Sequence, residues 1–178
     1  MTQDLSPQVK ATIKATVPAL SEHGPAITAA MYELLFRDPQ IAALFNQANQ
    51  KSGAQLHALA GAIIAYAKHI DDLGALGPAV ERIAQKHIGY AILPEHYPHV
   101  ATALLAAIQK VLGEAATPEV MDAWGQAYWF LADILKGREA EIRDDLSAKT
   151  GSWTGWRRFV ITERRQESQT IMSFNLRP

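Results

Sequence analysis

The chain has 178 residues, of which 48% are hydrophobic and 20% are charged, and its formal net charge is −1. This composition is typical of a globular domain that buries a substantial core without covalent cross-links. The chain has no cysteine, which excludes disulfides, thiolate metal sites and iron–sulfur clusters. We expect no membrane span and a cytoplasmic protein, because the N-terminus lacks an apolar signal core and no apolar run reaches membrane-spanning length.

Charge is distributed unevenly along the chain. Residues 1–147 carry 11 Lys and Arg against 16 Asp and Glu, whereas residues 148–178 carry 6 basic and 2 acidic residues. The acidic excess of the larger part argues against nucleic acid as a partner. We therefore predict a main domain over residues 1–147 and a separate basic segment over residues 148–178.

Residues 1–147 show helical patterns throughout, with proline and glycine between the helices. Pro18 is expected to end or kink the first helix, and Gly24-Pro25 to open the second. Helical segments are expected to start at Pro7, Pro25, Pro39, Ser52, Pro78, Pro94 and Pro118. About seven short helices of this kind predict an all-α, globin-like packing in place of a regular four-helix bundle.

The pattern changes after residue 147. Arg158–Glu163 and Ile171–Leu176 alternate apolar and polar residues on either side of a polar loop, which predicts a β-hairpin. An isolated two-stranded hairpin is marginally stable in water. The hairpin is therefore expected to belong to a larger sheet, or to pair with a second copy of the chain in a homodimer.

One histidine follows apolar positions on a predicted helix. Val80, Ile83, Ala84 and His87 fall at i, i+3, i+4 and i+7, so they share one helix face. Such a histidine is either a buried imidazole bonded to a carbonyl or a neighbouring side chain, or the ligand of a haem iron in an apolar pocket. The spacing alone leaves both interpretations open.

The stretch before His87 carries other features that a globin haem pocket requires. Phe45 lies at a predicted bend, and Gln55 and Leu59 lie four residues apart on the next predicted helix. His87 follows 32 residues after Gln55. A globin places the ligand histidine on one side of the haem, and a helix with a polar group and a bulky apolar residue on the other.

Four separated stretches show a resemblance to a known family. Three of them resemble the haem domain of bacterial flavohaemoglobins: ALFNQANQKSGAQLHALAGAIIAYA, IAQKHIGYAILPEHYP and MDAWGQAYWFLADILKGREAEI. The fourth resembles the opening of the flavin-binding barrel that follows it: WTGWRRFVITERRQESQTIMSFNLRP. Together they cover nearly the whole chain in the family's order, and the resemblance implies an incomplete flavin domain over residues 148–178.

The resemblance implies a proximal site around His87, which would be the haem iron ligand. Tyr97 and Glu139 would then form a hydrogen-bonding layer behind the imidazole. A carboxylate in that place gives the ring partial imidazolate character, which favours oxygen activation. The local sequence alone favours Glu139 as a surface residue of a charge run, and Tyr97 fits equally well as a core tyrosine whose hydroxyl is bonded to a carbonyl.

The resemblance also implies a distal side. Tyr32 and Gln55 would be its hydrogen-bonding groups, and Leu59, Phe45 and Ile83 would contact the haem. Locally, Tyr32 fits the core equally well. Ser52 and Gln55 match a capping box, which would direct the amide to the helix start.

The function that the resemblance implies is nitric oxide dioxygenation by haem b, with dioxygen and nitric oxide as substrates and a flavin and NAD(P)H reductase as electron source. FAD itself is not expected on this chain, because the flavin- and nicotinamide-binding motifs do not occur in it. Two alternatives are an oxygen-binding globin for delivery or storage, and a helical interaction domain without cofactor. Trp129 departs from the family, where a small residue is expected.

Overall fold

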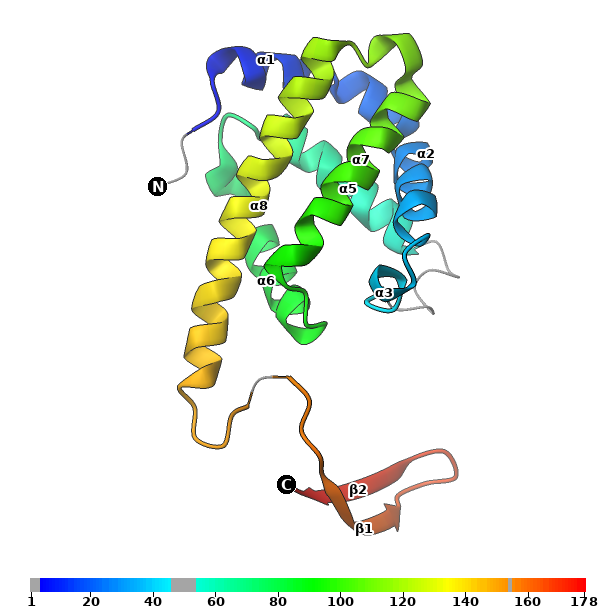
Figure 1. Cartoon of the computed structure of the whole chain (residues 1–178), viewed down its shortest axis with the longest axis vertical. Coiled ribbons are helices and arrows are strands. Elements are labelled where there is room, and N and C mark those ends of the chain that lie inside the picture. The colour runs from blue at the N-terminus through cyan, green and yellow to red at the C-terminus, as the bar shows by residue number, and fades with distance from the viewer. Residues whose placement is uncertain (1–3, 46–53, 154) are drawn as a thin grey trace. The chain divides into compact units, whose positions relative to one another are not determined.

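The computed structural model describes residues 4–45, 54–153 and 155–178, with the side chains of Ala54 and Gln55 outside that description. Its α-helices are α1 (Pro7–Ala15), α2 (Val17–Leu35), α3 (Pro39–Ala42), α5 (Ala54–Lys68), α6 (Gly77–Gly89), α7 (Tyr97–Leu112) and α8 (Pro118–Ser147) (Figure 1). Three short 3-10 turns join them at η1 (Leu73–Leu76), η2 (Pro94–His96) and η3 (Gly113–Ala115). The all-α, globin-like prediction is confirmed.

Helix α2 packs against both α5 and α7. Gly24 permits its close approach to α5, since a Cβ at this position would lie 3.4 Å from both the Ala60 Cβ and the Ile64 Cδ1 atoms. The Thr28 hydroxyl is completely buried there and donates to backbone carbonyls, including that of Leu56 on α5 at 3.2 Å. A glycine without a side chain and a threonine whose hydroxyl is hydrogen-bonded therefore let α2 and α5 pack closely.

The prediction that Gly24-Pro25 opens a helix is wrong. Helix α2 begins at Val17, with Pro18 in its first turn and Pro25 inside it. Pro18 is tolerated because the first-turn N–H groups have no intrahelical acceptor. Pro25 removes one backbone hydrogen bond, but the helix continues through the buried residues Gly24, Ile27 and Thr28. The packing of α2 against its neighbours therefore outweighs the tendency of Gly24-Pro25 to interrupt a helix.

The last long helix closes the core. The Tyr66 hydroxyl on α5 donates to the Ala127 carbonyl on α8 at 2.7 Å. Trp124 on the same helix is buried, as are Ile13 of α1 and Ile108 of α7. Trp124 and Ala127 of α8 belong to the same buried cluster as Ile13 and Ile108, and the continuation of α8 carries the polar residues of the candidate site.

The chain forms two compact units, residues 1–142 and 143–178. In the second unit β1 (Val160–Gln166) and β2 (Met172–Arg177) pair antiparallel, with Ile161 opposite Leu176 and an irregularity between Ile161 and Glu163. The predicted hairpin is confirmed. The domain boundary at residue 147 remains a prediction.

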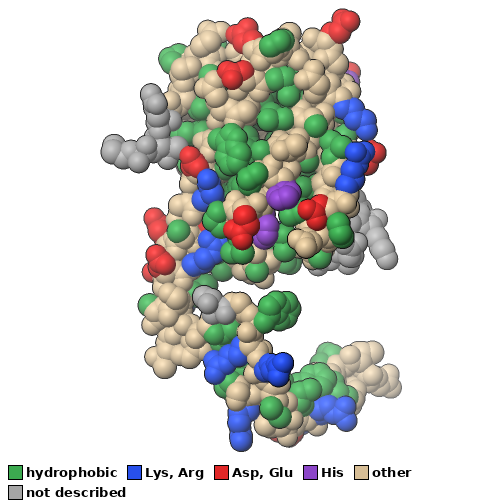
Figure 2. All heavy atoms as spheres, viewed as in Figure 1, with side chains coloured by type: hydrophobic (Ala, Val, Ile, Leu, Met, Phe, Trp, Pro, Cys, Tyr) green, Lys and Arg blue, Asp and Glu red, His purple; other side chains and the backbone are tan. Residues whose placement is uncertain are grey.

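Every residue of the two strands is exposed. On the face drawn in Figure 2, hydrophobic side chains and lysine or arginine side chains share the surface of the hairpin unit. None of the described helices combines the length and the apolar run that crossing a bilayer requires.

Candidate functional site

Helix α6 presents His87 in its last turn. The helix begins at Gly77 with Pro78 in its first turn, and it ends at Gly89. Ala84 is its one buried residue, whereas Ile83 and His87 are half-buried. Ile83 packs against a small cluster that Tyr97, Ala132 and Leu135 form between α7 and α8. The apolar face predicted for this helix therefore faces a neighbouring cluster and leaves the imidazole partly accessible.

Two residues that are distant in the sequence meet the His87 ring. Its Nδ1 atom lies 2.7 Å from Oε1 of Glu139 and 3.2 Å from the Tyr97 hydroxyl. The same Tyr97 hydroxyl donates to Oε1 of Glu139 at 2.5 Å. Tyr97 is buried at the start of α7, and Glu139 on α8 has no exposed surface. The structure thus brings together the three residues that were predicted for the proximal side.

The hydrogen bonds determine which ring nitrogen carries the proton. The single hydrogen of the Tyr97 hydroxyl is used toward Glu139, and an ionised carboxylate only accepts. With Glu139 ionised, Nδ1 of His87 is therefore the donor in this contact. In the neutral imidazole the lone pair then lies on Nε2. This donor set fits a group that needs one neutral nitrogen ligand, because the ring presents a free lone pair from a nitrogen that does not contact Glu139.

Aromatic rings gather around Tyr32, which is buried on α2. Its ring centroid lies 5.2 Å from that of Phe36 and 5.5 Å from that of Phe45. Phe45 and Leu59 are half-buried and pack against the main core. That these residues wall a distal pocket opposite His87 stays a prediction. The side chain of Gln55 lies outside the described residues, so the distal and capping interpretations of that amide both stay predictions.

Several residues around this site were not found by sequence reasoning. The Tyr128 hydroxyl donates to the Tyr97 carbonyl at 2.7 Å, and burial raises the pKa of that phenol. The Lys136 ammonium lies 6.0 Å from the Tyr97 ring centroid and 5.5 Å from that of Trp129. Trp129, which we predicted to depart from the family, is 39% exposed and lies edge-on to Tyr128. The indole is therefore outside the core that surrounds Tyr97.

A second polar contact between α6 and α8 was also missed. Arg138 donates from Nε to Glu81 at 2.7 Å and from Nη2 to the other oxygen of that carboxylate at 3.3 Å. The one sequence feature that pointed to this contact is that Arg138 directly precedes Glu139. The charge run around it reads as a solvated face, because the sequence does not reveal that α6 lies within reach.

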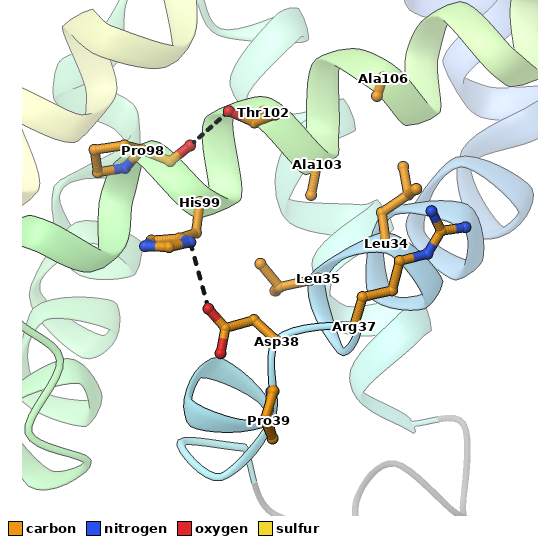
Figure 3. Close-up of a pocket in the computed structure, with 10 residues that line it drawn as sticks. All are labelled: Leu34, Leu35, Arg37, Asp38, Pro39, Pro98, His99, Thr102, Ala103 and Ala106. Carbon is orange, nitrogen blue, oxygen red and sulfur yellow. Dashed lines mark hydrogen bonds and ion pairs between the residues drawn. The ribbon is translucent and has the colours of Figure 1, made fainter.

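A separate hollow of about 790 Å³ lies between the end of α2, α3 and α7 (Figure 3). Asp38 and His99 face each other across it, with Oδ2 and Nδ1 4.0 Å apart. Apart from Gln55, whose side chain lies outside the described residues, none of the residues predicted for the site lines this hollow. Among the described residues, no cluster of three or more histidine, aspartate and glutamate side chains is arranged to hold a metal ion.

The helical fold and a lone histidine backed by a buried carboxylate define the class of globins. Residues 28–135 match the globin family, and the chain therefore belongs to it. Within that class it is similar to flavohaemoproteins, since it is 64% identical to a flavohaemoprotein of Xylella fastidiosa (strain 9a5c) over all 178 residues. The predicted resemblance is confirmed.

Two solved structures are similar to the chain. An engineered carbene transferase, derived from a candidate nitric oxide dioxygenase of Rhodothermus marinus, is 40% identical with a TM-score of 0.75, covering 80% of this chain and 99% of that one. The flavohaemoglobin of Malassezia yamatoensis, solved with bound FAD and haem, is 29% identical with a TM-score of 0.82. The match covers 99% of this chain and 46% of the Malassezia chain. The chain spans 45% of the length of the Xylella relative.

Proposed function

We propose that this chain is the haem-binding globin module of a nitric oxide dioxygenase and that it holds one haem b through Nε2 of His87. The observation that carries the proposal is the contact of Nδ1 with the buried carboxylate of Glu139 at 2.7 Å. In the neutral imidazole this contact supports the tautomer that leaves Nε2 unprotonated, and an unprotonated imidazole nitrogen is the form that binds iron.

The buried carboxylate also determines how strongly the imidazole donates electrons. Acceptance of the Nδ1 proton by an anion gives the ring partial imidazolate character and raises its basicity as a ligand. A more strongly donating proximal ligand favours cleavage and activation of oxygen. Tyr97 holds the carboxylate by its own hydrogen bond at 2.5 Å, so the acceptor is fixed before any cofactor binds.

On the distal side, Tyr32 would supply an O–H donor within an apolar wall. A donor held in a water-excluded pocket stabilises negative charge that develops on a substrate oxygen. Its rotation is restricted by the rings of Phe36 and Phe45 at 5.2 and 5.5 Å. Gln55 would add a second donor, and Leu59, Phe45 and Ile83 would contact the haem edge and faces.

When bound, the haem would supply the iron at which dioxygen and nitric oxide are converted to nitrate. The residues of the chain would supply electron donation, distal hydrogen bonding and exclusion of water. Each cycle requires electrons, which we assign to a flavin and NAD(P)H reductase. This partner is supported by the flavohaemoprotein relatives and by the Malassezia flavohaemoglobin that was solved with both FAD and haem.

Haem titration of the purified chain tests the ligand. We expect a Soret band with wild type and its loss or marked weakening in His87→Ala. His69→Ala is the matched control, because His69 is an exposed histidine near the end of another helix. A visible spectrum of His87→Ala that equals that of wild type would sink the proposal.

Turnover distinguishes the dioxygenase from an oxygen-binding globin. The haem-loaded chain is mixed with an NAD(P)H-dependent flavin reductase, and nitric oxide consumption and nitrate formation are followed over many equivalents. Sustained formation of nitrate is expected. Nitrate that stops at one equivalent because a reductase that is active on another electron acceptor does not reduce the oxidised iron again would favour oxygen delivery or storage instead.

A further inference from the structure

Helix α6 has little buried surface to hold it in place. Ala84 is the one residue of this helix that is buried. Val80 and Ile83 are half-buried and pack against the small cluster between α7 and α8. A helix fixed mainly by a buried apolar stripe would bury several residues in succession. The orientation of α6 therefore depends on its side-chain contacts with α8.

Two polar contacts join α6 to α8. At the C-terminal end of α6, His87 contacts Glu139 at 2.7 Å. Nearer its start, both oxygens of Glu81 accept from Arg138, at 2.7 and 3.3 Å. Glu81 and His87 are six residues apart, roughly 9 Å along the helix axis. Two attachment points at that separation prevent α6 from pivoting about either one, which a single contact would permit.

Glu81 and Arg138 each form a further hydrogen bond with a residue of their own helix. Gln85 donates to Glu81 at 2.9 Å within α6, and Arg138 donates to Glu141 at 2.8 Å within α8. A guanidinium that binds a carboxylate through two N–H groups has a defined relative orientation as well as a distance. The four residues therefore form a directional link, which we call the Glu81–Arg138 clamp.

The electrostatics agree with this geometry. The Arg138 guanidinium, followed by the Gln85 amide, lowers the pKa of Glu81 to about 2. The same carboxylate raises the pKa of Arg138. Both side chains are partly exposed, at 35% for Arg138 and 44% for Glu81. Ion pairs at that exposure contribute little to global stability, so the expected consequence of the clamp is positional.

We propose that Glu81 and Arg138 are positioning residues that orient α6 and thereby hold Nδ1 of His87 against Glu139. Arg138 and Glu139 are consecutive on α8, so one turn of that helix fixes both the clamp and the proximal acceptor. Loss of the clamp lets the start of α6 move and lengthens the Nδ1 hydrogen bond. The imidazole then loses imidazolate character. This inference rests on the proposed role of His87 as the iron ligand.

Resonance Raman spectroscopy of the haem-loaded ferrous chain without a gas ligand tests the clamp, because the iron–histidine stretching band reports the hydrogen bond at Nδ1. We expect Glu81→Gln and Arg138→Gln each to shift this band to lower frequency. The double variant is expected to shift it no further than either single one, since both changes remove the same link. Arg82→Gln, an exposed charge on the same helix, is the control and leaves the band in place.

Thermal unfolding separates a positional effect from loss of fold, and the variants are expected to unfold within a few degrees of wild type. An unshifted band in Glu81→Gln would overturn the inference, and so would an equal shift in Arg82→Gln. Wild-type chain that shows no iron–histidine band overturns the proposed function itself, which is a distinct result.

Discussion

At the scale of single residues, the most costly group in the helical part is the Glu139 carboxylate. It has no exposed surface, and a buried carboxylate is tolerated only when hydrogen bonds and charges compensate its desolvation. Tyr97 and His87 both contact its Oε1 atom, at 2.5 and 2.7 Å. Replacing a buried ionised pair by apolar residues is often neutral or stabilising, so we expect Glu139 to be kept for its effect on the imidazole of His87.

Glu139→Gln tests whether the charge of this carboxylate matters for the proposed reaction. The amide keeps the shape of the side chain but removes the charge that polarises the imidazole. We expect nitric oxide turnover with added reductase to fall by about 10- to 100-fold, as is typical when a hydrogen-bond partner of a metal ligand is lost. Asp145→Asn, an exposed acidic residue on the same helix, serves as control. Unchanged turnover in Glu139→Gln would show that the carboxylate is purely structural.

Tyr66 offers a stability test away from the site. Tyr66→Phe removes the bond to the Ala127 carbonyl and should lower the free energy of unfolding by about 1 kcal/mol in chemical denaturation. Tyr90→Phe, on an exposed tyrosine, should change it little.

Burial also raises the pKa of Tyr66 above its ordinary value of 10.0. Its folded form therefore favours the neutral phenol, and the stability it contributes is complete below pH 10 and lost as the pH rises further. The alkaline loss of stability should be smaller in Tyr66→Phe than in wild type; an identical alkaline profile would contradict this.

At the scale of elements, α2 and α6 are held in opposite ways. Helix α2 buries eight of its residues and tolerates an internal proline. Helix α6 buries one residue and relies on polar links to α8. This difference suits a helix that carries a ligand, because a polar link fixes orientation without filling the space that a cofactor needs.

The acid dependence of stability follows from the clamp. Glu81 has its pKa lowered from 4.5 to about 2 in the folded chain. Its contribution is therefore present above pH 4.5 and is lost as the pH falls toward 2. Because the pair is partly exposed, we expect only a small difference in unfolding free energy between wild type and Glu81→Gln at neutral pH, and we expect that small difference to narrow over this interval. A difference that stays constant between pH 5 and pH 2.5 would contradict the ion pair.

At the scale of the whole molecule, the hairpin unit exposes apolar side chains that a two-stranded sheet cannot cover. Ile171, Phe174 and Leu176 are 59%, 49% and 56% exposed. Such a surface in water favours pairing with further strands. We propose that in the isolated chain the partner is a second copy.

Light scattering of the full chain and of a chain that ends at Ala148 tests the pairing. We expect the full chain to have the mass of a dimer and the shorter chain that of a monomer with the same helical circular dichroism. If both chains have the mass of a monomer, the proposed dimer is wrong.

Local signals in the sequence determined the helices, the hairpin and the apolar face that carries His87, because helix starts and residue periodicity depend on near neighbours. They failed at Gly24-Pro25, where packing against α5 overrides the proline. The family resemblance supplied Tyr97 and Glu139, which local patterns place in the core and on the surface. Only the tertiary structure brought Glu139 to Nδ1 of His87 and Arg138 to Glu81, because these pairs are separated by more than 50 positions and no local pattern encodes a distance across two helices.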